Sequence, residues 1–336
     1  MTKVVCISGD GIGPSIVEAT RRIIDASGAA IEWIEADAGL GAFERLGNPL
    51  PDETIQLIRE HNVALKGPLT TPVGAGFRSI NVALRREFDL YINLRPTRSF
   101  KGVESRFSDI DLVIFRENTE GLYSGVERYV DEKHSAAESV AIVTRAGAER
   151  IIRASFEYAV RHGRRKITLV HKANILKFTS GMFLEVGRQI ATEFPQVEFD
   201  DKIIDNMAMQ MVINPNQFDV IVTTNLFGDI LSDLASGLVG GLGLAPGANI
   251  GTGASIFEAV HGSAPDIAGR NIANPAALLL AGTMMLRHLD MREQAQRIET
   301  ALAEVIAEGR HVTRDLNRES GVGTTEMTQA IIDCMK

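Results

Sequence analysis

The feature that most constrains the fold is a regular alternation of short apolar runs with longer amphipathic segments. Strands are predicted at residues 4–8, 31–35, 111–115, 139–144, 166–171 and 220–224, and helices at 14–26, 53–61, 147–161 and 178–193. This alternation is typical of an α/β protein with a largely parallel sheet. The glycine-rich residues 237–253 hold too much hydrophobic content for a flexible linker, and we expect an ordered loop there that closely approaches a ligand or another backbone.

Length and composition narrow the class of protein. A chain of 336 residues with 45% hydrophobic residues is long enough for two domains. The net charge of −8 and the lack of a long Lys/Arg run argue against nucleic acid as a partner, and no apolar run is long enough for a membrane span. Cys6 and Cys334 have no metal-type spacing and are expected to be inert thiols. We therefore expect a cytoplasmic protein, or a mitochondrial-matrix protein if a leader was removed.

The first glycine turn resembles half of a dinucleotide-binding motif. Gly9, Gly11 and Gly13 follow the first predicted strand and open a helix. The third glycine comes one residue too early for the dinucleotide spacing, and Pro14 follows it, as is common in the first turn of a helix. We interpret the segment as a tight strand-to-helix turn, with direct cofactor contact as the alternative.

Residues 78–116 form a basic segment. Asn81 and Arg85 are four residues apart and share a helix face, and Ser79 lies where a helix N-cap belongs. Arg95 and Arg116 each follow an apolar run, which is where ligand-contacting side chains lie in open α/β sheets. Three arginines suit a substrate with several carboxylates. Ordinary surface charge is the alternative interpretation.

An acidic segment follows later. From Ile203 to Gly269 the chain has no Lys or Arg, yet Asp229 and Asp233 are spaced to share one helix face. Like charges at that spacing repel, and near a core they must be neutralised. A hard divalent cation would neutralise them. The alternative is that both aspartates are solvated and bind no cation.

Two residues are candidates for proton transfer. Tyr123 lies in a polar, glycine-flanked loop, and Lys172 directly follows a predicted strand. A lysine near a phenol and aspartates is suited to acid–base work. The sequence does not indicate whether the two side chains meet.

Together these motifs resemble the isocitrate/3-isopropylmalate dehydrogenase family, the β-decarboxylating dehydrogenases. The similarity covers essentially the whole chain, and its most specific stretches are residues 9–14, 225–233, 240–249, 258–269 and 273–275. The resemblance implies a two-domain isopropylmalate dehydrogenase-like α/β fold, not a Rossmann fold. Residues 1–95 and 240–336 would form the large, cofactor-side domain, residues 96–239 the small dimerisation domain, and the cleft between them the active site.

The resemblance also implies a homodimer with shared active sites. Lys172, Asn174 and Asp205 would reach the partner's site. Mg²⁺ or Mn²⁺ would be held by Asp205, Asp229 and Asp233, with Tyr123 and Lys172 as the catalytic pair. The malate-like carboxylates would bind to Arg85, Arg95 and Arg116.

Substrate and cofactor choice follow from two positions of the resemblance. Ser79 and Asn81, instead of apolar residues, resemble the isocitrate enzymes, where they meet a third carboxylate. Asp266 resembles the NAD pattern, although Arg318 falls where NADP-linked relatives place a phosphate-binding arginine. The expected cofactor-binding residues are Glu258, His261, Gly262, Ala264, Asp266, Ile267 and Asn274.

We therefore expect an NAD-dependent enzyme that oxidatively decarboxylates isocitrate. Homoisocitrate or 3-isopropylmalate dehydrogenase is the alternative on the same scaffold. A non-catalytic regulatory subunit is the alternative of another class, but Tyr123, Lys172 and the three metal-type aspartates argue against it.

Overall fold

The computed structural model describes residues 1–71 and 79–336. The chain folds into two compact units. The first unit comprises Met1–Phe88, Arg98–Asp109 and Ser236–Lys336, and the second comprises Asp89–Thr97 and Ile110–Ala235. The domain boundaries expected after residues 95 and 239 fall within strand β4 (Ile92–Arg98) and directly after helix α8 (Asn225–Leu238).

The first unit contains a mostly parallel run of strands in the order β2-β1-β3-β12-β11. Strands β1, β2, β3 and β12 are parallel, and β11 runs antiparallel to β12. Their bounds are β1 (Thr2–Ile7), β2 (Ile31–Ala36), β3 (Val63–Lys66), β11 (Pro246–Ile250) and β12 (Ser255–Ala259). The buried positions of β1 are consecutive, as expected for a strand covered on both faces.

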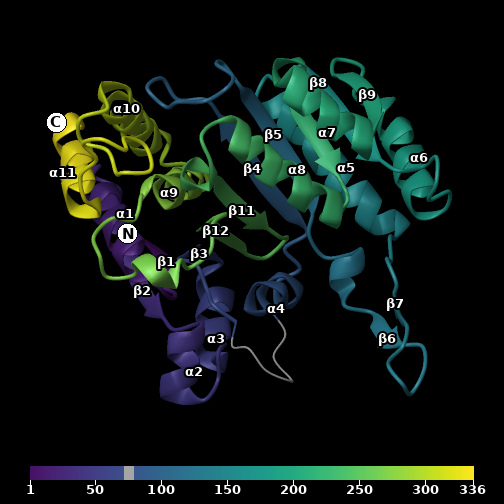
Figure 1. Ribbon diagram of the computed structural model, residues 1–336, viewed down its shortest axis with the longest axis horizontal. Helices are drawn as coiled ribbons and strands as arrows, with labels where there is room; N and C mark the ends of the chain where they lie inside the picture. The colour runs from purple at the N-terminus through teal and green to yellow at the C-terminus, as the bar shows by residue number, and fades with distance from the viewer. Residues whose placement is uncertain (72–78) are drawn as a thin grey trace. The chain divides into compact units, whose positions relative to one another are not determined.

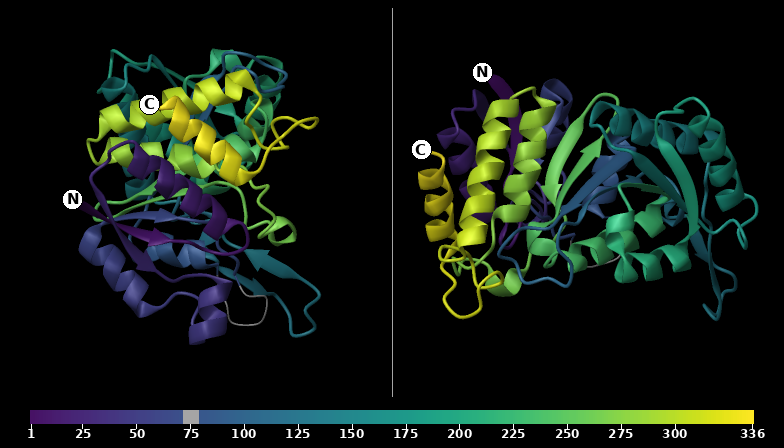
Figure 2. Two further views of the ribbon diagram at one scale, coloured as in Figure 1. Left: turned by 90° about the vertical axis from the view of Figure 1, so that its left-hand side faces the viewer. Right: turned by 90° about the horizontal axis from the view of Figure 1, so that it is seen from above.

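Helices cover this sheet. Helix α9 packs on β3, β11 and β12, helices α1 and α10 pack on α9, and α11 packs on α1 and α10 (Figures 1 and 2). Helix α3 packs against β1, β2 and β3. The helices of the unit are α1 (Gly13–Ala26), α2 (Leu40–Leu46), α3 (Asp52–His61), α4 (Ile80–Glu87), α9 (Ala276–His288), α10 (Arg292–Glu308) and α11 (Thr324–Cys334).

The second unit contains strands in the order β4-β5-β10-β8-β9, of which β5, β10, β8 and β9 are parallel. The further strands are β5 (Asp111–Glu117), β8 (Lys166–His171), β9 (Glu198–Ile203) and β10 (Val220–Thr223). Its helices, besides α8, are α5 (Arg145–Arg161), α6 (Thr179–Ala191) and α7 (Ile204–Ile213). Strands β6 (Glu127–Tyr129) and β7 (Ala137–Ser139) form a separate antiparallel pair (Figure 1).

The predicted α/β alternation is confirmed, with two local errors. Residues 139–144 were expected to form a strand, but only Ser139 is in one. The side chains of Val140 and Ile142 are each 44% exposed, so this apolar run is not a core strand, and Thr144 instead caps α5. Part of the expected loop at 237–253 is strand β11, because its small, buried residues pair with β12.

The first glycine turn is a close-packed junction. A Cβ atom at Gly9 would lie 2.3 Å from the carbonyl oxygen of Pro68, and one at Gly11 would lie 2.0 Å from that of Ser263; both glycines have positive φ. The interpretation of this segment as a tight strand-to-helix turn is therefore supported. No helix in the described part of the chain is long and apolar enough to cross a membrane.

Asp10 ties this junction to two other loops. Its buried carboxylate accepts backbone N–H groups from Leu40 at 2.9 Å, Gly41 at 2.9 Å and Thr70 at 2.7 Å. The Thr70 hydroxyl lies 2.7 Å from the hydroxyl of Ser263. Asp10 thereby joins the first glycine turn to the backbone at Leu40, Gly41 and Thr70.

Replacing Asp10 by Asn tests this junction. The amide loses one acceptor oxygen, so at least one buried N–H group is left unsatisfied, and the free energy of unfolding should fall by about 2 kcal/mol. Urea unfolding measures the change. Asp290→Asn, at a carboxylate whose side chain is 86% exposed, is the control and should change the stability little. Equal stability of both variants would contradict the role given to Asp10.

Candidate functional site

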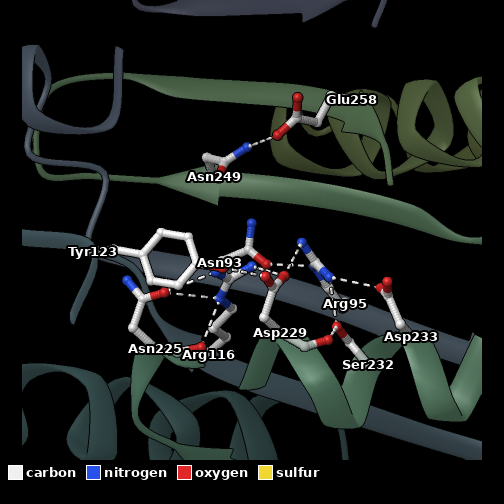
Figure 3. Close-up of polar contacts among 10 residues, drawn as sticks. All are labelled: Asn93, Arg95, Arg116, Tyr123, Asn225, Asp229, Ser232, Asp233, Asn249 and Glu258. Carbon is white, nitrogen blue, oxygen red and sulfur yellow. Dashed lines mark hydrogen bonds and ion pairs between the residues drawn. The ribbon is translucent and has the colours of Figure 1, made fainter. Parts of the chain in front are cut away.

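Arg116 is the most deeply buried charge of the second unit, with only 1% of the residue exposed. It is near the end of β5, and its guanidinium donates to the carbonyl and side-chain oxygens of Asn225 at 2.8–3.2 Å. It also pairs with Asp229 (Figure 3). A Cβ atom at Gly228 would lie 2.5 Å from the Arg116 side chain, so α8 can pack on this arginine only with glycine there.

Arg95 reaches the same helix from β4. Its Nε donates to Asn93 at 2.7 Å, and its Nη1 and Nη2 lie 3.4 Å from Asp233 and 3.5 Å from Asp229. Ser232 also accepts from Nη1 (Figure 3). Two of the three expected substrate arginines therefore meet two of the three expected metal aspartates.

These arginines supply the missing counter-charge. The acidic segment has no Lys or Arg of its own, but Arg95 and Arg116 neutralise Asp229 and Asp233 from β4 and β5. Burial raises the pKa of Asp233, and the charge of Asp229 adds to the rise against the opposing effect of Arg95. The sequence predicted a divalent cation as a neutralising group, and the structure adds these two arginines.

Tyr123 lies at the same cluster. Its hydroxyl donates to Asp229 Oδ2 at 2.5 Å, and the Arg116 guanidinium lies 5.1 Å from its ring centroid. Burial raises the pKa of the Tyr123 phenol, and the bond to Asp229 raises it further, while Arg116 opposes the rise. The phenol therefore keeps its proton at neutral pH, as an acid requires.

Lys172 forms a second, separate pair in this unit. Its ammonium group lies 2.8 Å from Asp205, which is at the start of α7, and hydrogen bonds from Lys172 lower the pKa of that exposed carboxyl. Asn174 is exposed in the same turn. Within the described residues no group of three His, Cys, Asp or Glu side chains could hold a metal, so Asp205 does not join Asp229 and Asp233 there.

In the first unit, Glu258 on β12 forms a buried ion pair. Lys66 Nζ lies 2.5 Å from its Oε2. Asn249 donates to the Glu258 carboxylate at 2.6 Å (Figure 3). Burial raises the pKa of Glu258, but the charges of Lys66 and Arg85 and the two hydrogen bonds outweigh it and bring the pKa to about 2. Glu258 is thus ionised at neutral pH.

Helix α4 carries the expected substrate row. Ser79 precedes the helix and is exposed, while Asn81 and Arg85 are half-buried on it. Ile80 and Leu84 of the same helix are buried. Asn81 Oδ1 and Arg85 Nε are shielded from solvent and have no hydrogen-bond partner in the described part of the chain.

Most of the expected cofactor residues surround one cavity of about 380 Å³ in the first unit. Those that line it are His261, Gly262, Ala264, Ile267 and Asn274. Burial lowers the pKa of His261, whose Nδ1 bonds to the carbonyl of Gly262 at 3.0 Å, so the ring is neutral at pH 7. Asp266 does not line the cavity but lies exposed in the adjoining 3-10 turn (Pro265–Ile267).

The sequence reasoning missed several residues. Lys66 follows an apolar run, the same signal that identified Lys172, and could have been found. Asn225 lies in a motif that was recognised, but its bonds to Arg116 could not be read from spacing. Arg314 and Asp315 line the same cavity, although only the neighbouring Arg318 was considered. Asn274 donates to Asp315 at 2.8 Å.

Comparisons with known proteins agree on one family. The model of the family described as isocitrate/isopropylmalate dehydrogenase matches residues 3–331. The crystal structure of isocitrate dehydrogenase from Methylococcus capsulatus is 58% identical, covers 100% of this chain and 99% of that one, and superposes with a TM-score of 0.97.

Two curated relatives differ in nucleotide. The mitochondrial NAD-isocitrate dehydrogenase catalytic subunit 5 of Arabidopsis thaliana is 48% identical over 97% of this chain and 86% of its own length. The NADP-isocitrate dehydrogenase of Thermus thermophilus is 47% identical over 98% of this chain and 67% of its own length. The comparisons therefore leave the nucleotide open.

Replacing Glu258 by Gln tests the buried pair. Its pKa of about 2 is depressed below the ordinary carboxyl value of 4.5, so its stabilisation is present above pH 4.5 and is lost as the pH falls toward 2. At pH 7 the variant should lose about 3 kcal/mol of unfolding free energy.

The pH dependence distinguishes this loss from a packing defect. In urea unfolding, the difference between wild type and Glu258→Gln should shrink by about 2 kcal/mol between pH 7 and pH 3. Glu198→Gln, at a largely exposed carboxylate, is the control. A pH-independent difference would show that the charge of Glu258 does not stabilise the fold.

Proposed function

Because the chain belongs to the isocitrate/isopropylmalate dehydrogenase family, we propose that it is an NAD-dependent isocitrate dehydrogenase that uses Mg²⁺ or Mn²⁺. The expected family resemblance is confirmed, and so is the α/β fold of this family. The proposed reaction converts isocitrate to 2-oxoglutarate and CO₂.

The polar row on α4 carries the choice of substrate. Ser79, Asn81 and Arg85 offer a hydroxyl, an amide and a guanidinium, which suit a carboxylate and not an alkyl group. The shielded Nε of Arg85 has no partner in the described part of the chain, and a bound carboxylate would satisfy it. A tricarboxylate therefore fits this row better than isopropylmalate does.

Asp266 supports NAD as the nucleotide. Asp266 is exposed in the turn Pro265–Ile267, of which Ile267 lines the cavity, and its carboxylate would accept hydrogen bonds from ribose hydroxyls and repel a 2′-phosphate. Arg314 lines the same cavity and Arg318 follows it, and these two charges favour NADP instead. We favour NAD because a like charge opposes the phosphate directly.

The donor set fits a divalent cation. Asp229 and Asp233 lie one helical turn apart on α8 and supply the hard oxygen ligands that Mg²⁺ and Mn²⁺ prefer. Both face arginines, so a bound cation would share them with Arg95 and Arg116. When bound, the cation supplies Lewis acidity toward the substrate hydroxyl and the nicotinamide accepts a hydride.

A homodimer would complete this donor set. In this chain Asp205 pairs with Lys172 and does not join the other two aspartates. Exposed apolar side chains on the same unit, Phe178 at 90%, Ile213 at 61% and Ile230 at 55%, would be covered by a second copy. We accordingly assign Lys172, Asn174 and Asp205 to the partner's site.

The protein side chains then have separate tasks. Arg95 and Arg116 hold and orient the malate-like carboxylates by bidentate hydrogen bonds. Lys172 or an aspartate takes the proton of the substrate hydroxyl as hydride leaves the same carbon. After CO₂ has left, Tyr123 protonates the carbon, and Lys172 returns a proton to the phenol.

A substrate panel tests the proposal. With Mg²⁺, isocitrate and NAD should give fast nucleotide reduction that a chelator abolishes, whereas homoisocitrate, 3-isopropylmalate and NADP should each be at least about tenfold poorer in kcat/KM. Turnover of homoisocitrate or isopropylmalate alone would overturn the interpretation of Ser79 and Asn81. Preference for NADP would overturn that of Asp266, and no turnover would favour a regulatory subunit.

Replacing Tyr123 by Phe tests the protonation step. Removal of a general acid should lower overall turnover by roughly 10²–10⁴-fold, and the keto acid intermediate should escape. The ratio of 2-oxoglutarate to reduced nucleotide measures this escape. Tyr129→Phe, on an exposed hairpin, is the matched control. Full turnover by Tyr123→Phe would show that another group protonates the carbon.

A further inference from the structure

His171 is a buried histidine beside the proposed catalytic lysine. It is the last residue of β8 and is 5% exposed. Its Nδ1 accepts the backbone N–H of Ala173 at 3.0 Å. Because Nδ1 is the acceptor, the ring proton lies on Nε2, which is 3.1 Å from Asp201 Oδ2. Its two neighbours thus fix one tautomer of the ring.

Asp201 is held from its other side. It lies on β9, which is parallel to β8, and the pairing of Leu169 with Asp201 places it on the sheet face that His171 shares. Arg188 of α6 donates to Asp201 Oδ1 at 3.0 Å. Burial raises the pKa of Asp201, but the bonds from Arg188 and His171 outweigh it, so the carboxylate stays ionised.

The imidazole fixes the turn that carries Lys172. Lys172 lies between His171 and the N–H group that the ring accepts. The Lys172 carbonyl accepts N–H groups from Ile175 at 3.0 Å and Leu176 at 2.8 Å, so both hydrogen-bonding groups of the peptide bond between Lys172 and Ala173 have partners. Its ammonium group then extends to Asp205. The direction of the lysine side chain depends on this backbone.

We propose that His171, anchored by Asp201 and Arg188, is a positioning residue that aims the ammonium group of Lys172 for proton transfer. The proposal rests on the proposed function, because it requires Lys172 to take part in the reaction. Supporting groups of this kind fix the orientation of reacting side chains, and their loss typically lowers activity about 10- to 100-fold.

Two amide variants separate the two bonds of the ring. His171→Asn keeps an acceptor for the N–H two residues ahead, as asparagine does in turns. His171→Gln keeps a donor toward Asp201 but loses that acceptor. His162→Gln, at an exposed histidine beyond α5, is the control.

Steady-state kinetics with isocitrate give the first readout. We expect His171→Gln to lower kcat about 10- to 100-fold with KM within about twofold, and His171→Asn to keep kcat within about threefold of wild type. Equal kcat values for the two variants, or an unchanged kcat for His171→Gln, would overturn the proposal. If His171→Gln fails to fold, Arg188→Gln tests the proposal instead, because the Arg188 side chain is 62% exposed. It should lower kcat about two- to fivefold, and no decrease would overturn the proposal.

Exchange of a C3 proton of 2-oxoglutarate with solvent measures the proton-transfer step by itself. In D₂O, with metal and reduced nucleotide, a C3–H bond of 2-oxoglutarate breaks, its proton passes to the acid–base groups, and a deuteron returns. NMR should show slow exchange in His171→Gln and near-normal exchange in His171→Asn. Lys172→Met separates the two claims: if it keeps full turnover and exchange, the proposed function of Lys172 fails. If it is inactive while His171→Gln is active, only the positioning role fails.

Discussion

The buried pairing of Arg116 with Asp229 is the interaction on which the second unit's site depends. A guanidinium with 1% exposure is tolerated only where its N–H groups are satisfied, and Asn225 and Asp229 supply the acceptors from the first turns of α8. The pair therefore sets where α8 begins against β5. Because Asp229 also accepts from Tyr123, the same contact places the phenol. The buried charge of Arg116 thus fixes how β5, α8 and the proposed acid Tyr123 are arranged.

The first unit also has a buried ion pair on its sheet. Lys66 and Glu258 face each other on the paired strands β3 and β12, and the Asn249 amide of β11 donates a further hydrogen bond to Glu258. Such a pair stabilises little relative to an apolar core, but it is costly to break because one charge would stay buried. The pair with Lys66 therefore keeps an ionised Glu258 at a fixed position on β12. The charge of Arg85 also acts on this anion, which links the proposed substrate row of α4 to it.

The sequence was sufficient to predict the fold, but not to predict which of the candidate site residues pair with one another. Periodicity located β8 and α5, because burial of one face is a local property. It failed at residues 139–144, because an apolar run does not show whether anything covers it. The counter-charges of Asp229 and Asp233 lie more than 100 residues away in sequence, on β4 and β5. No local pattern reports such a long-range neutralisation, and the bonds between His171 and Asp201 were missed for the same reason.

These pairings change how ligand binding should be understood. Asp229 and Asp233 already occupy the hydrogen-bonding groups of Arg95 and Arg116 that substrate carboxylates would need. A dicarboxylate entering alone would compete with them and leave aspartates unpaired, whereas a divalent cation would draw the aspartates to itself and free the arginines. Cation and substrate would then bind with positive coupling, each removing the cost that the other meets. Because such coupling is reciprocal, the affinity for the cation should rise in the presence of substrate by the same factor as the affinity for substrate rises with the cation.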